Sequence, residues 1–409
     1  MVQVAIMGHG VVGSGVAEIL LTHNESLKKK VYKEINIKYI LDLREFPELP
    51  YADKFTKDFN DIVNDDEVKV VAEVMGGVNP AFDFVKRCLE AGKSVVTSNK
   101  ELVAKKGAEL LAIAKEHNVN FLFEASVGGG IPIIRPLNNC LVANEVDEIA
   151  GILNGTTNFI LTKMITESMS FKDALALAQQ LGYAERDPSA DVEGHDACRK
   201  ICILASLAYG KHVYPDNIHT EGITNISLED VEYAERWGGV IKLIGDVKKT
   251  ESGLLDIFVA PMLISNDSQL SSIDDVFNGI LVKGDATGDV VFYGKGAGKL
   301  PTASAVVADI VDCVKHISAR KYLFWDDCDG SNVMPYEQSV SAMYVRAIGD
   351  IKVVKAVFGE VSKLQRNNAP DNEIAFTTSA MTVKEFNDKL SQLAENGVEV
   401  INTIRIGDL

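Results

Sequence analysis

The first third of the chain alternates short apolar runs with stretches of helical period. Five apolar runs, at 2–7, 35–41, 68–74, 93–96 and 120–124, predict buried strands. Helical stretches follow the first, third and fourth of these runs. This alternation predicts an α/β fold, a Rossmann-type doubly wound parallel sheet, in which ligands bind at the carboxyl ends of the strands.

The middle of the chain predicts an α+β layer with an open sheet. The expected elements are a strand at 148–153, helices through 159–164, 172–181 and 196–209, and strands at 254–260, 279–284 and 289–293. The strands at 254–260 and 279–284 alternate like antiparallel strands. A second glycine-rich loop, 294–298, precedes a helix at 302–314. We expect it to bring the chain back over the first glycine turn.

The tail predicts a small ferredoxin-like module after a linker at 328–335. Its expected elements are strands at 341–347, 373–378 and 398–406 and helices at 352–365 and 382–395. A further strand near 366–372 is expected to be short or absent. Thr382 is a predicted helix cap, with Glu385 three residues later.

Composition then narrows the partners and the compartment. The 409 residues are 46% hydrophobic and carry a formal charge of −17, which disfavours binding to nucleic acid or anionic membranes and leaves small molecules as the expected partners. Six scattered cysteines without a Cys-x-x-Cys pair predict buried thiols in a reducing compartment. The chain opens on a strand-like segment and has no apolar run of membrane-spanning length, so we expect no signal peptide and a cytoplasmic protein.

A glycine turn follows the first predicted strand. Gly8, Gly10 and Gly13 form Gly-x-Gly-x-x-Gly between a strand and a helix, with Val11 and Val12 inside the motif. Glycines there let the backbone approach a pyrophosphate at the helix N-terminus. The alternative is a plain strand-to-helix turn. His9 is expected on the solvent side of this loop, without a chemical role.

The second strand ends in Asp42, with Arg44 two residues later. An acid at this place holds the ribose 2′-hydroxyl of NAD, whereas an arginine accepts the 2′-phosphate of NADP. The pattern leaves the cofactor preference open. Lys100 follows the fourth strand at a helix start, where it opposes the helix dipole. Because a lysine at this position does not stabilise the helix, we expect Lys100 to interact with a ligand.

Two further turns have open interpretations. Glu124 precedes Gly128, Gly129 and Gly130, which can turn carbonyl oxygens inward around a hard cation or form a flexible crossover. The residues alone favour the crossover. The small polar turn 154–158 before a helix is either an anion seat, for example for a substrate carboxylate, or a simple helix cap.

The densest charged segment is 178–200. Pro188 disfavours helix just before it, so the preceding helix is expected to end near Gly182. Asp196 and Lys200 are four residues apart and share a helix face at the mouth of an apolar helix. A lysine surrounded by acids suits proton transfer. The alternative is a surface loop capped by acids.

The segment Ala178-x-x-x-Gly182-Tyr183-Ala184-x-x-Asp187-Pro188-x-x-Asp191-Val192-x-Gly194-x-Asp196-x-x-x-Lys200 resembles the signature of homoserine dehydrogenase. Further similar motifs lie at 8–13, 73–77, 97–100, 124–132, 151–158 and 292–298. The resemblance covers about residues 1–320. It departs from the family pattern at His9 and at the spacing of Asp42 and Arg44. No kinase domain is expected before the Rossmann segment, as in the monofunctional enzymes of the family.

The resemblance implies the reversible, NAD(P)H-dependent reduction of aspartate 4-semialdehyde to homoserine in threonine and methionine biosynthesis. It makes Lys200 the proton donor and Lys100 a second catalytic lysine. It makes Glu185 the group that receives the substrate ammonium, with Asp191, Asp196, Gly155 and Thr156 as further substrate-binding residues. The implied cofactor residues are Gly8, Gly10, Val11, Val12, Gly13, Asp42, Arg44, Ser98, Lys100 and Gly296. A sodium or potassium ion is implied near Glu124, Val127, Gly129 and Ile131, and this reverses the preference for a crossover.

The resemblance also implies an organisation into domains. We expect a dinucleotide-binding domain at 1–135 with a helix at about 301–318 packing back on it, a catalytic and dimerisation domain at 136–320, and an ACT-like regulatory domain at 336–409. The module at 336–409 has two interpretations. It is either the domain through which threonine regulates the protein or a structural or dimerising tail. A homodimer or higher oligomer is expected. Two rival functions remain open, another Rossmann amino-acid dehydrogenase and a catalytically silent amino-acid sensor.

Overall fold

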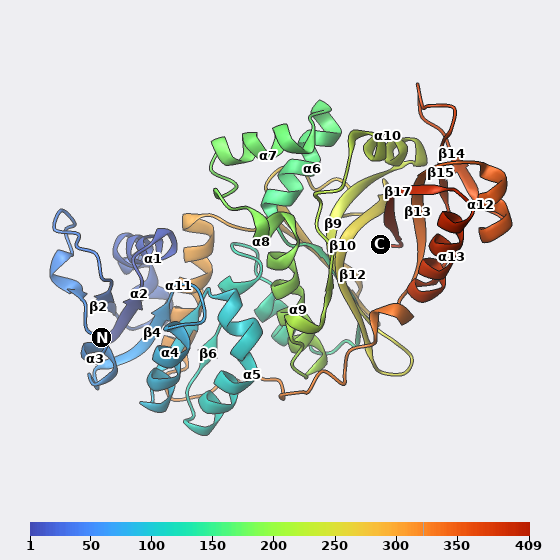
Figure 1. Cartoon of the computed structure of the whole chain (residues 1–409). Helices are drawn as coiled ribbons and strands as arrows, with labels where there is room; N and C mark the ends of the chain where they lie inside the picture. Colours follow the sequence, from blue (N-terminus) through green and yellow to red (C-terminus); the bar gives the residue numbers. More distant parts are fainter. Residues whose placement is uncertain (322) are drawn as a thin grey trace. The chain divides into compact units, whose positions relative to one another are not determined.

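The computed structural model describes residues 1–321 and 323–409 (Figure 1). The chain divides into two compact units, each assembled from segments far apart in the sequence. Unit one comprises Met1–Glu145, Cys202–Pro215 and Gly294–Gly330, and unit two comprises Val146–Ile201, Asp216–Tyr293 and Ser331–Leu409.

Unit one contains a six-stranded sheet in the order β3-β2-β1-β4-β5-β6. Its strands are β1 (Val2–Met7), β2 (Ile35–Leu41), β3 (Phe55–Thr56), β4 (Val68–Glu73), β5 (Ser94–Thr97) and β6 (Phe121–Leu122). All neighbouring strands run parallel. This confirms the predicted doubly wound parallel sheet. β6 is shorter than predicted because the chain turns into a 3₁₀ helix, η2 (Glu124–Ser126).

The helices of unit one flank this sheet. They are α1 (Val11–Thr22), α2 (Asn24–Val31), α3 (Asn60–Val63), α4 (Ala81–Glu90), α5 (Lys100–Glu116) and α11 (Lys299–Lys315). α11 packs closely on α1, where a Cβ added to Gly15 would lie 2.9 Å from Cβ of Ala303. Lys299 at the start of α11 also pairs with Glu18 of α1 at 2.7 Å. The loop 294–298 and its helix therefore return to the helix that follows the first glycine turn.

Unit two contains a mixed sheet in the order β12-β11-β7-β9-β10-β17-β13-β15-β14, with β8 beside β10 and β16 beside β13. Its strands are β7 (Val146–Ile152), β8 (His219–Thr220), β9 (Gly239–Lys249), β10 (Leu255–Ser265), β11 (Phe277–Gly284), β12 (Gly288–Lys295), β13 (Val340–Ile348), β14 (Ser362–Leu364), β15 (Glu373–Thr377), β16 (Met381–Thr382) and β17 (Glu399–Gly407). The predicted antiparallel character is found where β10 pairs with β9 and β11 with β7. β9 was not predicted, because buried Lys242 and Asp246 interrupt its apolar pattern.

The helices of unit two are α6 (Gly155–Glu167), α7 (Phe171–Gln180), α8 (Ser189–Val192), α10 (Leu228–Trp237), α12 (Ile351–Phe358) and α13 (Val383–Glu395). α9 (His195–Tyr209) begins in unit two and belongs to unit one from Cys202 onward. α7 ends as predicted, since Gly182 adopts a left-handed φ of 77° two residues later. α6 begins at a cap in which the Asn154 side chain accepts the N–H of Thr157.

The C-terminal part of unit two has the order β13-α12-β14-β15-α13-β17, and its four strands lie in the order β17-β13-β15-β14. This is the predicted ferredoxin-like arrangement. α12 and α13 pack on one face of these strands (Figure 1). Two predictions need correction. The helix expected to reach residue 365 ends at Phe358, because Gly359 takes a φ of 78°, and the short second strand lies at 362–364 rather than 366–372.

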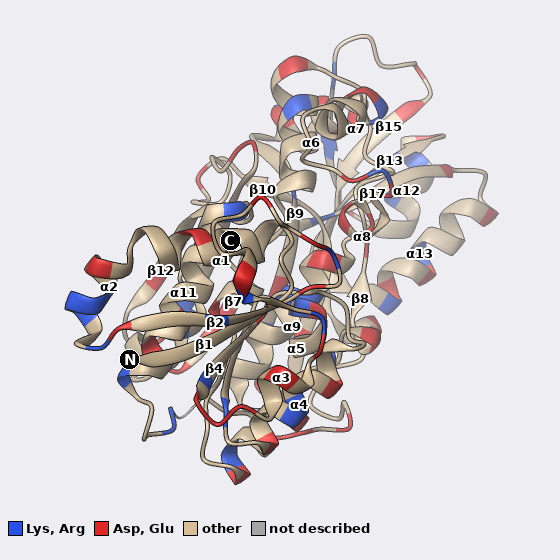
Figure 2. Cartoon of the chain, turned by 90° about the vertical axis from the view of Figure 1, so that its left-hand side faces the viewer, with Lys and Arg blue, Asp and Glu red and all other residues tan. Residues whose placement is uncertain are grey.

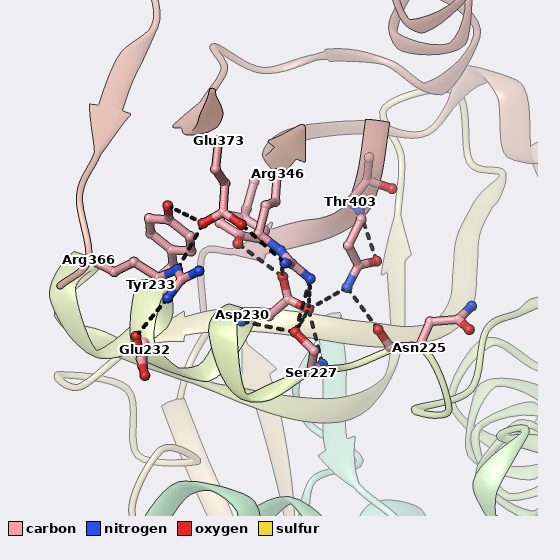
Figure 3. Close-up of polar contacts among 11 residues, drawn as sticks. Asn225, Ser227, Asp230, Glu232, Tyr233, Arg346, Arg366, Glu373 and Thr403 are labelled. Atoms are coloured by element: carbon pink, nitrogen blue, oxygen red, sulfur yellow. Dashed lines mark hydrogen bonds and ion pairs between the residues drawn. The ribbon is translucent and has the colours of Figure 1, made fainter. Parts of the chain in front are cut away.

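A buried polar network joins this C-terminal part to α10 (Figure 3). Asp230 of α10 is 1% exposed, and its Oδ1 accepts Nε–H of Arg346 at 2.8 Å and the hydroxyl of Tyr344 at 3.0 Å. Its Oδ2 accepts the side-chain amide of Asn402 at 2.8 Å and the N–H of Ser227 at 3.0 Å. β17 also pairs in parallel with β10, so the ferredoxin-like part and the rest of unit two share one sheet.

Charge and composition of the folded chain agree with the sequence expectations in part. Figure 2 shows basic and acidic positions interspersed along the elements. No helix among the described residues is long and apolar enough to cross a membrane. Cys88, Cys198, Cys202 and Cys313 are buried as predicted, but Cys140 is exposed and Cys328 is only partly buried.

Candidate active site

The glycine turn of unit one requires its glycines. Gly8 adopts a left-handed φ of 99°, and a Cβ on Gly13 would lie only 2.0 Å from the Gly8 carbonyl oxygen. Gly10 precedes α1 and offers no side-chain cap to its first N–H groups. The turn therefore leaves the N-terminus of α1, where Val11 and Val12 stand, suited to an anionic group.

Asp42 stands just beyond the carboxyl end of β2. Its Oδ2 accepts the backbone N–H of His9 at 2.8 Å, and its Oδ1 accepts that of Arg44 at 3.0 Å. The Arg44 guanidinium donates to both oxygens, at 2.9 Å from Nε to Oδ1 and 2.8 Å from Nη2 to Oδ2. These hydrogen bonds from Arg44 hold the pKa of Asp42 well below its usual range. Each oxygen of the ionised carboxylate thus accepts two donors.

A cavity of about 510 Å³ opens at these strand ends. Its lining includes Gly8, Gly10, Asp42, Arg44, Lys57 and Phe84. Four of the predicted cofactor residues therefore gather around one hollow in unit one. A cavity of this size with apolar walls and a few charged groups is typical of a cofactor site.

His9 corrects a prediction. It is 6% exposed rather than on the solvent side, and its ring packs edge-on against Phe46 and Phe55, with ring centres 4.7 and 5.0 Å away. Its Nε2 lies 3.2 Å from the hydroxyl of Tyr51. Burial lowers the pKa of His9, so the side chain serves as a packed, neutral part of the cavity wall.

Lys100 begins α5, next to a buried network at the ends of β4 and β5. Glu73 accepts the Thr97 hydroxyl at 2.6 Å and the N–H of Met75 at 2.8 Å, and burial raises its pKa. Asn99 caps α5 by accepting the N–H of Leu102 and donates to the carbonyl of Gly77 at 2.6 Å. This network fixes the turn that carries Ser98 and Lys100.

The loop after η2 packs against the second glycine loop. A Cβ on Gly129 would lie 2.2 Å from the carbonyl oxygen of Gly296. The Glu124 carboxylate accepts the backbone N–H groups of Ile133, Ile134 and Arg135 at 2.7–2.9 Å. These contacts take up most of its acceptor capacity.

A cation in this loop would therefore depend on carbonyl oxygens. Val127 and Ile131 are buried, and the Ile131 carbonyl faces Gly128, where an added Cβ would meet it at 2.4 Å. Among the residues that the structure describes, no group of three or more His, Cys, Asp and Glu side chains could hold a metal. Oxygen ligands of this kind suit a hard cation.

Unit two assembles the charged segment around Asn154, the cap of α6. The Asn154 side-chain amide donates to Asp191 Oδ1 at 2.7 Å and to Asp196 Oδ2 at 3.0 Å. Its carbonyl oxygen accepts the N–H of Thr157 at 2.9 Å. One side chain therefore caps a helix and bridges two acids.

Lys200 lies beside this bridge. Its Nζ is 2.8 Å from Asp196 Oδ2 and donates to the carbonyl oxygen of Leu153 at 2.7 Å. Both charged side chains are nearly inaccessible, at 7% and 5% exposure. The predicted pairing of Asp196 and Lys200 along one helix face is confirmed. The surface-loop alternative is wrong for this pair, because burying charges is costly unless they pair.

The other predicted substrate residues surround the same turn. Burial raises the pKa of Asp191, and the neighbouring charge of Asp196 raises it further. Thr156 donates its hydroxyl to the carbonyl of Tyr183 at 2.7 Å, which ties α6 to the segment before Glu185. Gly155 lies close to the backbone of Val276, and Glu185 is exposed.

Two residues of unit two were not predicted to belong to the site. Asn154 was part of a predicted polar turn but not a predicted site residue, although its place before Gly155 and Thr157 is the usual signal of a cap. Lys242 is fully buried in β9 and donates to the Ile273 carbonyl at 2.6 Å and to Asn158 Oδ1 at 3.2 Å. Through Asn158, Lys242 holds the first turn of α6 in place. No local pattern marks such a lysine.

Comparisons with known proteins agree on one family. The model of the homoserine dehydrogenase NAD-binding domain matches residues 8–124, and the homoserine dehydrogenase model matches 132–311. Homoserine dehydrogenase of Bacillus subtilis is 36% identical and aligns with 99% of this chain and 97% of its own. That of Synechocystis is 45% identical over 78% of this chain and 74% of its own.

Solved structures give the same answer. The homoserine dehydrogenase of Thiobacillus denitrificans superposes with a TM-score of 0.92 at 35% identity, covering 100% of this chain and 98% of that one. A crystal structure of Staphylococcus aureus homoserine dehydrogenase gives 0.82 at 32% identity, covering 100% and 99%. With the glycine turn and the buried lysine of the signature both in place, the chain belongs to the homoserine dehydrogenase family and is an NAD(P)-dependent oxidoreductase.

Proposed function

We propose that Lys200 is the general acid and base of the homoserine dehydrogenase reaction in this chain. The observation that supports this most directly is its buried position between Asp196 and the Leu153 carbonyl. The reaction interconverts aspartate 4-semialdehyde and homoserine. The bound nicotinamide cofactor supplies the hydride in reduction and accepts it in oxidation.

Reduction of the aldehyde leaves negative charge on its oxygen, which needs a proton or a positive charge nearby. The Lys200 ammonium offers both. Asp196 and Leu153 hold Nζ by two short contacts, so the proton is held at a fixed place. In oxidation the neutral amine takes the proton of the homoserine hydroxyl. A positioned acid of this kind contributes roughly 10²–10⁴ in rate.

The remaining residues bind and orient. We infer that Glu185, which is exposed, receives the substrate ammonium, and that Gly155 and Thr156 at the N-terminus of α6 receive its carboxylate. Asp191 and Asp196 position substrate and lysine. Lys100 is the proposed second catalytic lysine, supported by its place at the fixed start of α5.

For the cofactor, the glycine turn would receive the pyrophosphate, and Ser98 and Gly296 complete the proposed cofactor residues. Asp42 already accepts four donors from His9 and Arg44. We infer that it orients Arg44 rather than a ribose hydroxyl. Arg44 is 61% exposed and lines the cavity with Lys57, a pair suited to the 2′-phosphate of NADP. An archaeal homoserine dehydrogenase with a TM-score of 0.64 is described in complex with NADPH.

Three finer features are proposals as well. A sodium or potassium ion near 124–131 would use the carbonyl oxygens of Val127, Gly129 and Ile131. The open sheet of unit two is proposed to carry a homodimer interface. The ferredoxin-like part is proposed to be an ACT-like module through which threonine regulates the enzyme, with a structural tail as its alternative.

The testing experiment measures oxidation of NADPH and NADH by the purified chain with aspartate 4-semialdehyde, with and without threonine. We expect turnover with both cofactors, a higher kcat/KM with NADPH, and inhibition by threonine. Turnover only with another amino-acid substrate would favour a different dehydrogenase. No turnover with any nicotinamide cofactor would favour the silent sensor.

A further inference from the structure

Lys242 of β9 is a buried lysine outside the residues assigned above to substrate, cofactor and proton transfer. Its side chain is 0% exposed, and burial lowers its pKa although Asp274 opposes the shift. Nζ donates to three oxygen atoms, the Ile273 carbonyl at 2.6 Å, Oδ1 of Asp274 at 3.0 Å and Oδ1 of Asn158 at 3.2 Å. Three acceptors match the three N–H groups of an ammonium, whereas a neutral amine has only two. The contacts therefore hold Lys242 in its protonated form.

Asn158 of α6 completes this network. It is 1% exposed, and its Nδ2 donates to the carbonyl oxygens of Ile273 at 3.0 Å and Phe277 at 3.1 Å. Its Oδ1 accepts from Lys242, so every side-chain N–H group of these two residues has an acceptor. A buried polar network with all its donors satisfied rigidifies the elements that it joins. Here it joins β9, α6 and the segment 273–277.

Two more contacts fasten α6 to the same segment. The Thr162 hydroxyl donates to the Asn158 carbonyl at 2.7 Å and accepts the N–H of Asp275 at 3.0 Å. A Cβ added to Gly155 would lie only 2.7 Å from the Val276 carbonyl oxygen. The backbone of the segment therefore lies directly against the first residue of α6.

The same helix turn carries the cap residue Asn154. Its carbonyl accepts the N–H of Asn158 at 3.3 Å, and its side-chain amide donates to Asp191 at 2.7 Å and to Asp196 at 3.0 Å. Asp196 is paired with Lys200 at 2.8 Å. One helical turn thus separates Asn158 from the residue that bridges the two acids. The orientation of this turn sets where the bridging amide stands.

We propose that Lys242 is a positioning residue of the homoserine dehydrogenase reaction, which acts through Asn158 and the first turn of α6. It holds Asn154 where its amide meets both acids, and it keeps the N-terminus of α6 in place for the substrate carboxylate. The proposal rests on the roles proposed above for Lys200 and for that helix N-terminus.

The stability of the sheet does not call for an ammonium at this place. The neighbouring residues Ile241, Leu243 and Ile244 of β9 are buried and apolar. Replacing a buried ion by an apolar side chain of similar volume is often neutral or stabilising. What Lys242 adds is orientation, because its three donors fit only one arrangement of Asn158 and the segment 273–277.

Lys242→Met tests this role, because methionine keeps the unbranched apolar stem and has no N–H donor. We expect kcat/KM for aspartate 4-semialdehyde to fall by roughly ten- to a hundredfold, the loss caused by a small misplacement of catalytic groups, with KM for NADPH unchanged. Burial raises the pKa of Asp191, and the hydrogen bond from Asn154 limits the rise. Loss of that bond should therefore move the acidic limb of the kcat–pH profile to higher pH. A role confined to stability leaves the profile in place.

Lys93→Met is the matched control. Lys93 is 3% exposed and also donates to carbonyl oxygens, of Asp65 at 2.7 Å and Val68 at 3.2 Å. It directly precedes β5, at the amino end of the strand, whereas the proposed cofactor residues lie at the carboxyl ends. Both substitutions remove a buried ammonium, and urea unfolding reports the stability lost in each. Equal kcat/KM and equal pH profiles in Lys242→Met and Lys93→Met overturn the proposal.

Asn158→Ala breaks the same connection from the side of α6 and serves as the test if Lys242→Met does not fold. It should reproduce the loss of kcat/KM and the shift of the pH profile. In the double variant the two losses should not multiply, because both substitutions remove one connection. Wild-type kinetics in Asn158→Ala, or losses that multiply in the double variant, overturn the proposed route.

Lys200→Ala separates this proposal from the proposed reaction itself. A normal kcat in Lys200→Ala would remove the group that Lys242 positions and overturn both proposals. Wild-type kinetics in Lys242→Met beside an inactive Lys200→Ala would overturn only the positioning role of Lys242.

Discussion

Asp196 and Lys200 form an ion pair one helical turn apart on α9, with 2.8 Å between Oδ2 and Nζ and both side chains almost completely buried. Such a pair is weak evidence for stability, because removing two charges from water costs about as much as their attraction returns. Its position beside the cap of α6, where Asn154 bridges Asp191 and Asp196, instead suits a proton that must be held at one place.

Replacing Lys200 by alanine should lower kcat by roughly 10²–10⁴, the range of a positioned general acid, while the KM for the cofactor stays the same. Steady-state kinetics in both directions is the measurement. Lys163→Ala is the control, because Lys163 forms an i,i+4 pair with Glu167 on α6, where Glu167 is half exposed. A kcat of Lys200→Ala close to that of the control would remove Lys200 from the mechanism.

Asn154→Asp should keep the helix cap of α6 while changing the pH dependence of the reaction. The new carboxylate still accepts the N–H of Thr157 but places a third acid next to Asp191 and Asp196. The pKa of Asp191, already raised by burial, should rise further. We therefore expect the acidic limb of the kcat–pH profile to move to higher pH. Ser170→Ala, which removes the side-chain cap of α7 at a cost of about 1 kcal/mol, should leave the profile unchanged.

Local patterns predicted much of this site. Two features depend on only a few neighbouring residues, the strand–turn–helix at Gly8 and the i,i+4 spacing of Asp196 and Lys200. Hydrophobic periodicity and turn residues are therefore enough to predict them. Buried polar residues were missed for the same reason. From the sequence, His9 and Lys242 are expected at the surface. Their burial depends on polar partners far away in the sequence, the Tyr51 hydroxyl for His9 and the Ile273 carbonyl for Lys242.

Arg44→Ala should reduce affinity for NADPH more than for NADH. The Arg44 side chain is 61% exposed just after the end of β2, and Asp42 accepts hydrogen bonds from its guanidinium through both oxygens. Loss of a charged hydrogen bond to a phosphate is worth about 1.5–3 kcal/mol, or roughly ten- to a hundredfold in KM. Kinetics with both cofactors checks this, with exposed Lys29→Ala as the control. An equal loss for NADH and NADPH would contradict the assignment of Arg44 to the 2′-phosphate.

Asp246 predicts a pH dependence of stability. It is 1% exposed in β9, and burial raises its pKa although Lys248 opposes the shift. The folded protein therefore keeps a proton that the unfolded chain has lost above its ordinary pKa of 3.8, so this group makes the fold less stable as pH rises from about 4. Asn cannot ionise, and Asp246→Asn removes the effect.

The stability of Asp246→Asn relative to the wild type should therefore increase between pH 5 and 7, by at most about 1.4 kcal/mol per pH unit. Urea unfolding at several pH values is the measurement. Asp267→Asn is the control, because Asp267 is exposed after β10 and water solvates its charge in both states. Parallel stability curves for Asp246→Asn and the wild type would show that Asp246 is ionised in the fold.

Asp230→Asn should loosen the ferredoxin-like part from α10. The substitution keeps the shape of the side chain but removes the charge that pairs with the Arg346 guanidinium, which is 8% exposed and retains the carboxylate of Glu373 at 3.6 Å (Figure 3). Breaking a buried pair in this way costs about 3–5 kcal/mol, and the remaining acid puts the expected loss at the lower end. Glu232→Gln breaks the neighbouring pair with Arg366, in which Glu232 is 53% exposed, and should cost less than about 1 kcal/mol. Urea unfolding gives both values, and limited proteolysis should cut the tail of Asp230→Asn first. Similar losses in the two variants would mean that the network in Figure 3 does not secure the module.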